Sequence, residues 1–286
     1  DSLPLTHDNF FKKLSDWVDG DELPLSNGHV KKTDSPYEFT TLKTIYETEY
    51  PEEQFLVEHL IPAEGISCIA GLPGSMKSYF TNYISVCIAT GQSVLGQFQT
   101  KAVPILFIDK ENHLARIQQR FRALDLKDNL DNIHYMVGNP MIDRQRDLAS
   151  ICAFIQEKGI KLVILDTLVR LHGQDENSAT EMNRVFNCMK EINLSGAAVL
   201  IIHHFNKMQS DNIRDLLRGS GDILGQVDSY FAVKFKEDSI LQIEVGKSRD
   251  ERPLPPFLVN PQFNEEEKTL NFVFVNYLEE NSMTKQ

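Results

Sequence analysis

Apolar and polar positions alternate along most of the chain in two rhythms. Short continuous apolar runs predict buried strands at 66–70, 103–108, 133–137, 161–166 and 197–202. Segments with apolar residues three to four positions apart predict helices at 79–90, 114–124, 147–158 and 178–193. Because strands and helices take turns, the pattern predicts an α/β fold whose mainly parallel, twisted sheet is flanked by helices.

The two ends of the chain have a different pattern. Near the C-terminus, antiparallel strands that include a C-terminal β-hairpin are predicted at 230–236, 240–246 and 270–275. Short helical patterns precede the core at 8–18 and 42–50, with a linker-like stretch rich in Gly, Asp, Ser, Asn and Pro between them. We therefore expect an N-terminal arm over 1–54, a core domain over 55–277 and a polar tail over 278–286.

Composition narrows the class of protein. The chain is 41% hydrophobic and 24% charged, which is typical of a globular protein, and no apolar run approaches the ~20 residues of a membrane span. Its net charge of −12 argues against a surface that binds nucleic acid generally, so any DNA contact needs a local basic patch or an assembled ring. The chain begins with Asp1 rather than Met, as expected of a piece of a longer protein.

The cysteines favour a reducing compartment. Four of them lie in apolar strand or helix patterns without a C-x-x-C pair, at Cys68, Cys87, Cys152 and Cys188. We expect buried free thiols rather than disulfides or a metal site, and hence a cytoplasmic protein without membrane association.

A glycine-rich loop stands between the first predicted strand and its helix. Residues 71–78 read GLPGSMKS, in which Gly71 and Gly74 let backbone N–H groups converge on an anion at a helix N-terminus. Lys77 can reach the β- and γ-phosphates of a nucleotide, and the Ser78 hydroxyl can bind Mg²⁺. The stretch expected to contact the nucleotide comprises Gly71, Pro73, Gly74, Ser75, Met76, Lys77, Ser78 and Tyr79.

One position departs from the standard phosphate-loop pattern, G-x-x-x-x-G-K-[ST]. Met76 stands where glycine is expected, directly before the lysine. An ordinary strand-to-helix turn, or a degenerate loop that only binds nucleotide, therefore remains an alternative interpretation.

Polar residues follow three further predicted strands, where ligands of open α/β sheets bind. Asp166 can hold Mg²⁺, and Glu111 can orient and deprotonate the water that attacks a γ-phosphate. His203 or His204 could hydrogen-bond to that phosphate and relay the nucleotide state. A turn aspartate, a solvated glutamate and a packed histidine are the alternatives; a zinc site is disfavoured because no Cys or His lies at ligand spacing.

Taken together, these segments resemble the RecA-like P-loop ATPases. The resemblance rests on GLPGSMKS, FIDKEN, KLVILDTLVRL with HGQDEN, LIIHHFNK and LRGSGDILGQVDSYF, in this order over about residues 55–250. Within that superfamily, the sequence is most similar to the AAA-type group of RepA plasmid helicases and more distantly to DnaB-like replicative helicases. The resemblance implies a RecA-like core that binds ATP and Mg²⁺.

The resemblance also implies roles for single residues. Glu111 matches the family's catalytic glutamate, which we expect on the strand next to the phosphate-loop strand rather than beside Asp166. Lys247 and Arg249 resemble a K-x-R pair that reaches the ATP site of a neighbouring subunit, with Arg218 as a second candidate for this role. An arginine supplied in trans would make hydrolysis depend on assembly.

By the same resemblance, the chain is expected to form a hexameric ring that moves on single-stranded DNA through loops 171–177 and 205–221. An upstream primase or other replication domain is a further expected partner. Because Asp175 and Glu176 make the first loop acidic, a nucleotide-dependent regulator or clamp on a protein partner remains the alternative to a helicase in plasmid- or phage-like replication.

Overall fold

The computed structural model divides the chain into two compact units, Asp1–Tyr50 and Pro51–Gln286, which are described separately. It describes residues 39–49, 54–126, 128–175, 178–204, 223–236, 239–248 and 254–278. The predicted helix at 8–18, loop 205–221 and the tail beyond residue 278 lie outside these residues.

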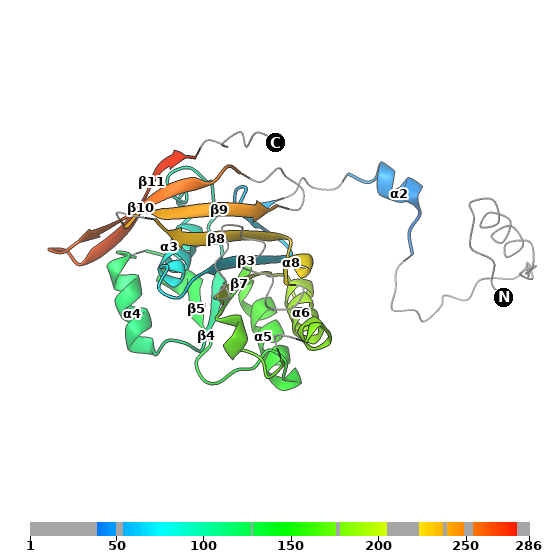
Figure 1. Cartoon of the computed structure of the whole chain (residues 1–286). Helices are drawn as coiled ribbons and strands as arrows, with labels where there is room; N and C mark the ends of the chain where they lie inside the picture. Colours follow the sequence, from blue (N-terminus) through cyan, green and yellow to red (C-terminus); the bar gives the residue numbers. More distant parts are fainter. Residues whose placement is uncertain are drawn as a thin grey trace, which may run out of the picture. The chain divides into compact units, whose positions relative to one another are not determined.

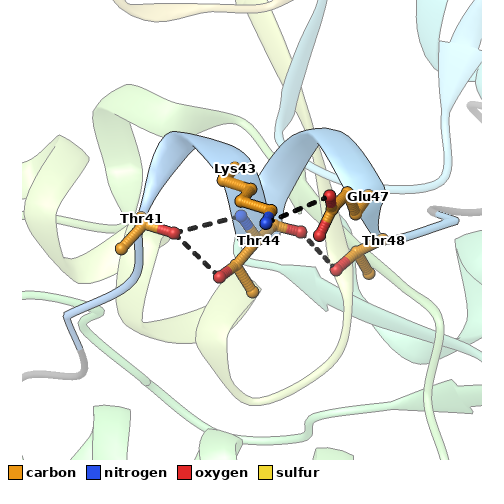
Figure 2. A network of polar contacts seen from close by, with 5 residues as sticks. All are labelled: Thr41, Lys43, Thr44, Glu47 and Thr48. Carbon is orange, nitrogen blue, oxygen red and sulfur yellow. Dashed lines mark hydrogen bonds and ion pairs between the residues drawn. The ribbon is translucent and has the colours of Figure 1, made fainter.

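In the first unit, the described residues form one short helix, α2 (Leu42–Glu47). The Thr41 hydroxyl caps it by accepting a hydrogen bond from the Thr44 N–H at 3.1 Å, and the Thr48 hydroxyl donates to the Thr44 carbonyl at 2.6 Å. An exposed Lys43–Glu47 ion pair of 3.8 Å completes these contacts (Figure 2). Local capping, rather than apolar burial, therefore defines this helix.

The second unit is built on a nine-stranded sheet with the order β11-β10-β9-β8-β3-β7-β6-β4-β5 (Figure 1). The strands of the sheet are β3 (Ile66–Gly71), β4 (Ile105–Asp109), β5 (Ile133–Tyr135), β6 (Leu162–Asp166), β7 (Ala198–His204), β8 (Ser229–Phe235), β9 (Leu241–Lys247), β10 (Phe257–Asn264) and β11 (Thr269–Tyr277). The strands from β8 to β5 pair in parallel, whereas β8 to β11 pair antiparallel. The predicted RecA-like class with a C-terminal β-hairpin is therefore confirmed.

Helices and short strands complete this unit. They are β1 (Phe55–Val57), β2 (Ile61–Pro62), α3 (Lys77–Thr90), α4 (Leu114–Ala123), η1 (Leu130–Asn132), α5 (Gln145–Lys158), η2 (Leu168–Arg170), α6 (Ala179–Leu194) and α8 (Ile223–Gln226). As the sequence predicts, Ser178 caps α6 by accepting a hydrogen bond from the Glu181 N–H at 3.4 Å. The Glu181 carboxylate accepts instead from the Asp175 N–H, at 2.7 Å. None of the helices in the described part of the chain is long and apolar enough to cross a membrane.

The sheet separates two hydrophobic cores, and this division decides where each strand-end side chain lies. The α3 core packs residues of α3 and the edge of α4 against one face of the sheet. The α6 core packs α5 and α6 against the other face (Figure 1, with α3 and α4 to the left of the parallel strands and α5 and α6 to the right). Because successive strand residues alternate between faces, neighbours in sequence enter different cores.

Two details of the strands correct the sequence-based expectations. The segment predicted to begin the antiparallel strands, β8, is parallel to β3 on one side and antiparallel to β9 on the other. The sequence patterns do not predict a strand at β10, which contains Pro261. Since β9 pairs with β10 only as far as Val259, the missing N–H of Pro261 costs no bond to β9.

The cysteines also differ in part from the expectation. Cys68 and Cys87 are buried, and burial raises the pKa of their thiols to about 12 and about 11, respectively. Cys152 and Cys188 are only half-buried. All four are free thiols in the structure, because none forms a disulfide.

Candidate nucleotide-binding site

The phosphate loop connects the end of β3 at Gly71 to the start of α3 at Lys77, and two of its glycines are required by conformation. A Cβ on Gly71 would lie 2.6 Å from the Val233 carbonyl oxygen and 2.5 Å from Ser75 Oγ. Gly74 has a φ of +81°, which side-chain-bearing residues rarely adopt. The loop can therefore curl at the N-terminus of α3, where backbone N–H groups favour an anion.

Met76 adopts the conformation for which the standard pattern uses glycine. Its φ of 59° and ψ of 12° lie in the left-handed region, which costs a non-glycine residue about 1–2 kcal/mol. Its side chain is half-buried against the α3 core, and this packing offsets part of that cost. The loop therefore keeps the glycine-like backbone without the glycine.

Lys77 is held inside the loop rather than in solvent. It is 4% exposed, and its Nζ donates a hydrogen bond to the Leu72 carbonyl at 3.0 Å. Burial lowers the pKa of Lys77, while the carboxylates of Asp166 and Glu111 act in the opposite direction. Ser78 and Tyr79 follow in the first turn of α3, both half-buried, whereas Pro73 is exposed.

Two carboxylates at the ends of adjacent strands have different surroundings. Asp109 and Asp166 are register partners of β4 and β6. Asp109 Oδ1 accepts hydrogen bonds from the N–H groups of Glu111 at 2.8 Å and Asn112 at 2.9 Å. Asp109 therefore shapes the loop that carries Glu111.

Asp166 is instead left with binding capacity. It is 2% exposed, and its Oδ1 is buried without a hydrogen-bond partner in the described structure. Burial, followed by the charges of Asp109 and Glu111, raises its pKa to about 7, against the opposing effect of Arg120 and Lys77. A buried, partly protonated carboxylate of this kind is suited to a cation.

Glu111 lies in the exposed loop after β4, within electrostatic reach of Lys77, Asp166 and His204. The strand that carries it is, however, not next to the phosphate-loop strand. β4 pairs with β6, and both β6 and β7 separate it from β3. The expectation placed Glu111 by the order of strands in the sequence, whereas pairing in the sheet puts its strand directly beside that of Asp166.

The two strand-end histidines face different cores. On β7, Leu200 and Ile202 belong to the α3 core, whereas the neighbouring Ile201 belongs to the α6 core. By alternation, His204 lies on the side of the phosphate loop and His203 on the opposite side.

The electrostatic surroundings of the two imidazoles agree with this assignment. Burial is the largest cause that lowers the pKa of both histidines, and Lys77 lowers both further. Glu111 acts on the pKa of His204, whereas His172 acts on that of His203. The carboxylate of the phosphate-loop side therefore faces His204, and a second histidine faces His203.

Arg120, on the half-buried side of α4, is a site residue that sequence reasoning missed. Its guanidinium carbon lies 4.9 Å from the ring centroid of Tyr79, and its Nε is buried without a hydrogen-bond partner among the described residues. It is also the first of the two cations that lower the pKa of Asp166. The available signal was an arginine beside the apolar stripe of the helix that follows Glu111.

The residues expected to act across a subunit boundary are only partly described. Lys247 ends β9, and its Nζ donates to the Val227 carbonyl of the same chain at 2.5 Å. Arg218 and Arg249 lie outside the described residues. Of loop 171–177, Leu171 and His172 are buried, while Gly173 and Asp175 are exposed.

The arrangement fits a nucleotide with its metal ion. Ser75 Oγ, Asp166 Oδ1 and His204 Nδ1 are buried atoms without hydrogen-bond partners in the described structure. Such groups are costly unless a ligand or water completes them. Phosphate oxygens accept hydrogen bonds from hydroxyl and ammonium groups, and Mg²⁺ prefers carboxylate and hydroxyl oxygens.

Comparisons with known proteins agree with this geometry. Residues 33–210 match the family described as AAA domain. No curated protein matches the sequence significantly. Among solved structures, the ATPase domain of a DnaB-like helicase is similar with a TM-score of 0.54 and 13% sequence identity, covering 75% of this chain and 86% of that one. The chain therefore belongs to the AAA domain family and has the fold of a RecA-like P-loop ATPase.

Proposed function

We propose that this protein is an ATP-driven motor of the hexameric DNA helicase type, which couples MgATP hydrolysis to single-stranded DNA in plasmid- or phage-like replication. The observation that carries the hydrolytic part is the convergence of Lys77, Asp166, Glu111 and His204 on one face of the sheet beside the phosphate loop.

Each residue has a distinct task in this proposal. Lys77 exchanges the Leu72 carbonyl for phosphate oxygens, and the Ser75 hydroxyl gains an acceptor. Ser78 and Asp166 hold Mg²⁺, which neutralises charge on the phosphates when bound. Glu111, exposed and close to these groups, takes the proton of the attacking water.

His204 is our choice for the strand-end residue that senses the γ-phosphate, because alternation along β7 places it on the phosphate-loop side. His203 faces the other core and is not assigned this task. The sequence alone left the two histidines undecided.

Assembly enters through the charge that hydrolysis develops. In the described structure, the cations that act on Asp166 are Arg120 and Lys77, and Arg120 already stacks on Tyr79. We propose that Arg249 or Arg218 of a neighbouring subunit adds a further cation, with Lys247 beside it. Release of Lys247 from the Val227 carbonyl would accompany this contact.

A regulator or clamp that hydrolyses ATP on a protein partner without unwinding DNA is the second candidate function. The net charge of −12 and the exposed Asp175 favour it, because phosphate backbones are tracked by positive surfaces. Loop 171–177 and loop 205–221 are the proposed DNA contacts of the motor, so charge reversal in them separates the two functions.

The test compares wild-type protein with Lys77→Ala and Glu111→Gln. A motor shows ATP turnover that single-stranded DNA stimulates, forked-duplex unwinding that needs both residues, and a larger mass with MgATP. Turnover without any DNA response would favour the regulator, and nucleotide binding without turnover would favour a binding-only module. A strict monomer under every condition would overturn the role of Arg249 or Arg218 in trans.

A further inference from the structure

On the side of the sheet away from the phosphate loop, a second polar cluster surrounds His203 and His172. The two imidazoles are 7% and 5% exposed, respectively. His203 ends the buried part of β7, and His172 follows Leu168 and Leu171, which both belong to the α6 core. Two histidines from different segments are therefore buried on the same side, and His172 influences the pKa of His203.

The orientation of His172 is set by its own loop. Its Nδ1 accepts a hydrogen bond from the Gln174 N–H at 3.3 Å, so the proton of the neutral imidazole is on Nε2. Nε2 is buried and has no hydrogen-bond partner among the described residues. An unsatisfied buried donor costs about 1–3 kcal/mol, which simple packing does not require.

A neighbouring segment clamps this loop. Asp143 Oδ2 accepts hydrogen bonds from the Gly173 N–H and from Gln174 Nε2, both at 2.9 Å, and the Ile142 N–H donates to the Leu171 carbonyl at 2.8 Å. The loop after η2 is therefore held on one side by Asp143 and has the unsatisfied donor of His172 on the other.

We propose that His172 is a positioning residue that joins the end of β7, through His203, to the loop 171–175, so that the state of the nucleotide site reaches that loop. The proposal rests on the proposed ATPase function. His204 and His203 are consecutive residues on opposite faces, so a shift of His204 towards a phosphate moves His203 on the other face. The Nε2–H of His172 gains or loses an acceptor in that movement, and Gln174 and Asp143 transmit the change.

Two substitutions separate the two halves of this imidazole. His172→Asn keeps an acceptor near Nδ1 but loses the ε donor, whereas His172→Gln keeps a donor near Nε2. We expect kcat for ATP to fall about tenfold in His172→Asn with KM unchanged, and to recover in His172→Gln. His134→Asn is the matched control, because His134 is a half-buried histidine that packs on Phe154 away from this cluster.

A second measurement decides the contact without ATP. A double-mutant cycle of His172→Asn and His203→Gln in urea unfolding should give non-additive midpoint shifts, whereas His134→Asn and His203→Gln should add. Additive shifts for His172 and His203 would overturn the network whatever the activity. Non-additive shifts with unchanged kcat would overturn its role in hydrolysis.

The wild-type protein separates this proposal from the proposed function. If it shows no ATP turnover, the proposed function fails and the coupling to hydrolysis falls with it, while the unfolding cycle still decides the contact. If wild type is active and both His172 variants equal it, only the positioning role is overturned.

Discussion

The two faces of the sheet differ most at the carboxyl ends of its parallel strands. On the α3 side, Lys77, Glu111, Asp166 and His204 come from four separate segments, and atoms of Asp166 and His204 are buried without partners in the described structure. On the α6 side, Asp143, Gln174 and His172 are bound to one another. The first face is arranged to receive a ligand and the second to hold a loop in place. Neighbouring residues such as His203 and His204 thus acquire different tasks from alternation alone.

The largest effect should come from the exposed carboxylate on the ligand face. We expect Glu111→Gln to lower kcat for ATP by about 10³-fold while nucleotide binding persists, because the amide cannot accept the proton of the attacking water. Glu64→Gln is the matched control, since Glu64 is exposed near the opposite end of β3. Turnover in Glu111→Gln within a few-fold of wild type would remove Glu111 from the reaction.

The buried carboxylate on the same face should cost stability. A raised folded-state pKa means that Asp166 destabilises the fold as pH rises from its ordinary 3.8 through about 7. A shift of 7 − 3.8, at 1.36 kcal/mol per unit, corresponds to up to about 4 kcal/mol. In chelator at pH 8, Asp166→Asn should therefore unfold at a higher urea concentration than wild type, although it loses turnover. Near pH 4 the advantage should disappear, and equal midpoints at pH 8 would contradict the burial argument.

The histidine on the opposite face should produce acid sensitivity. Burial, then the charges of His204, Lys77 and His172, lowers the pKa of His203 to about 4 from 6.5. The fold therefore has the full contribution of neutral His203 above pH 6.5 and loses up to about 3 kcal/mol as pH falls to 4. His203→Gln should flatten the pH dependence of the urea midpoint in this window. A slope as steep as that of wild type would show that other groups cause it, and His134→Gln controls for loss of a histidine.

The smallest effect should come from the phosphate loop itself. Met76→Gly removes left-handed strain but also side-chain packing, so we expect ATP turnover within about threefold of wild type and stability within about 1 kcal/mol. Met76→Val should be less stable by about 2 kcal/mol, because a β-branched residue fits the left-handed region poorly. Equal midpoints for the valine and methionine proteins would argue against a left-handed residue 76.

Local patterns were sufficient for most elements of the core. The alternation of apolar runs predicted β3, β4, β6 and β7 and the helices between them, because each has a strong period of its own. β10 was missed because Pro261 argues against a strand unless the pairing on that side is known to stop before it. Arg120 was missed because its proximity to Asp166 depends on how α4 packs.

By itself, the sequence determined which chemical groups end each strand: a phosphate loop, Glu111, Asp166 and a pair of histidines. Only the tertiary structure decided that β4 lies beside β6, that β7 separates β6 from β3, and that His204 rather than His203 shares the face of Lys77. The physical reason is that strand order depends on pairing between distant segments, and facing depends on which helices cover each side. Neither is encoded in the residues next to the loop, whereas the glycine-like backbone at Met76 is a local property whose cost is offset by packing.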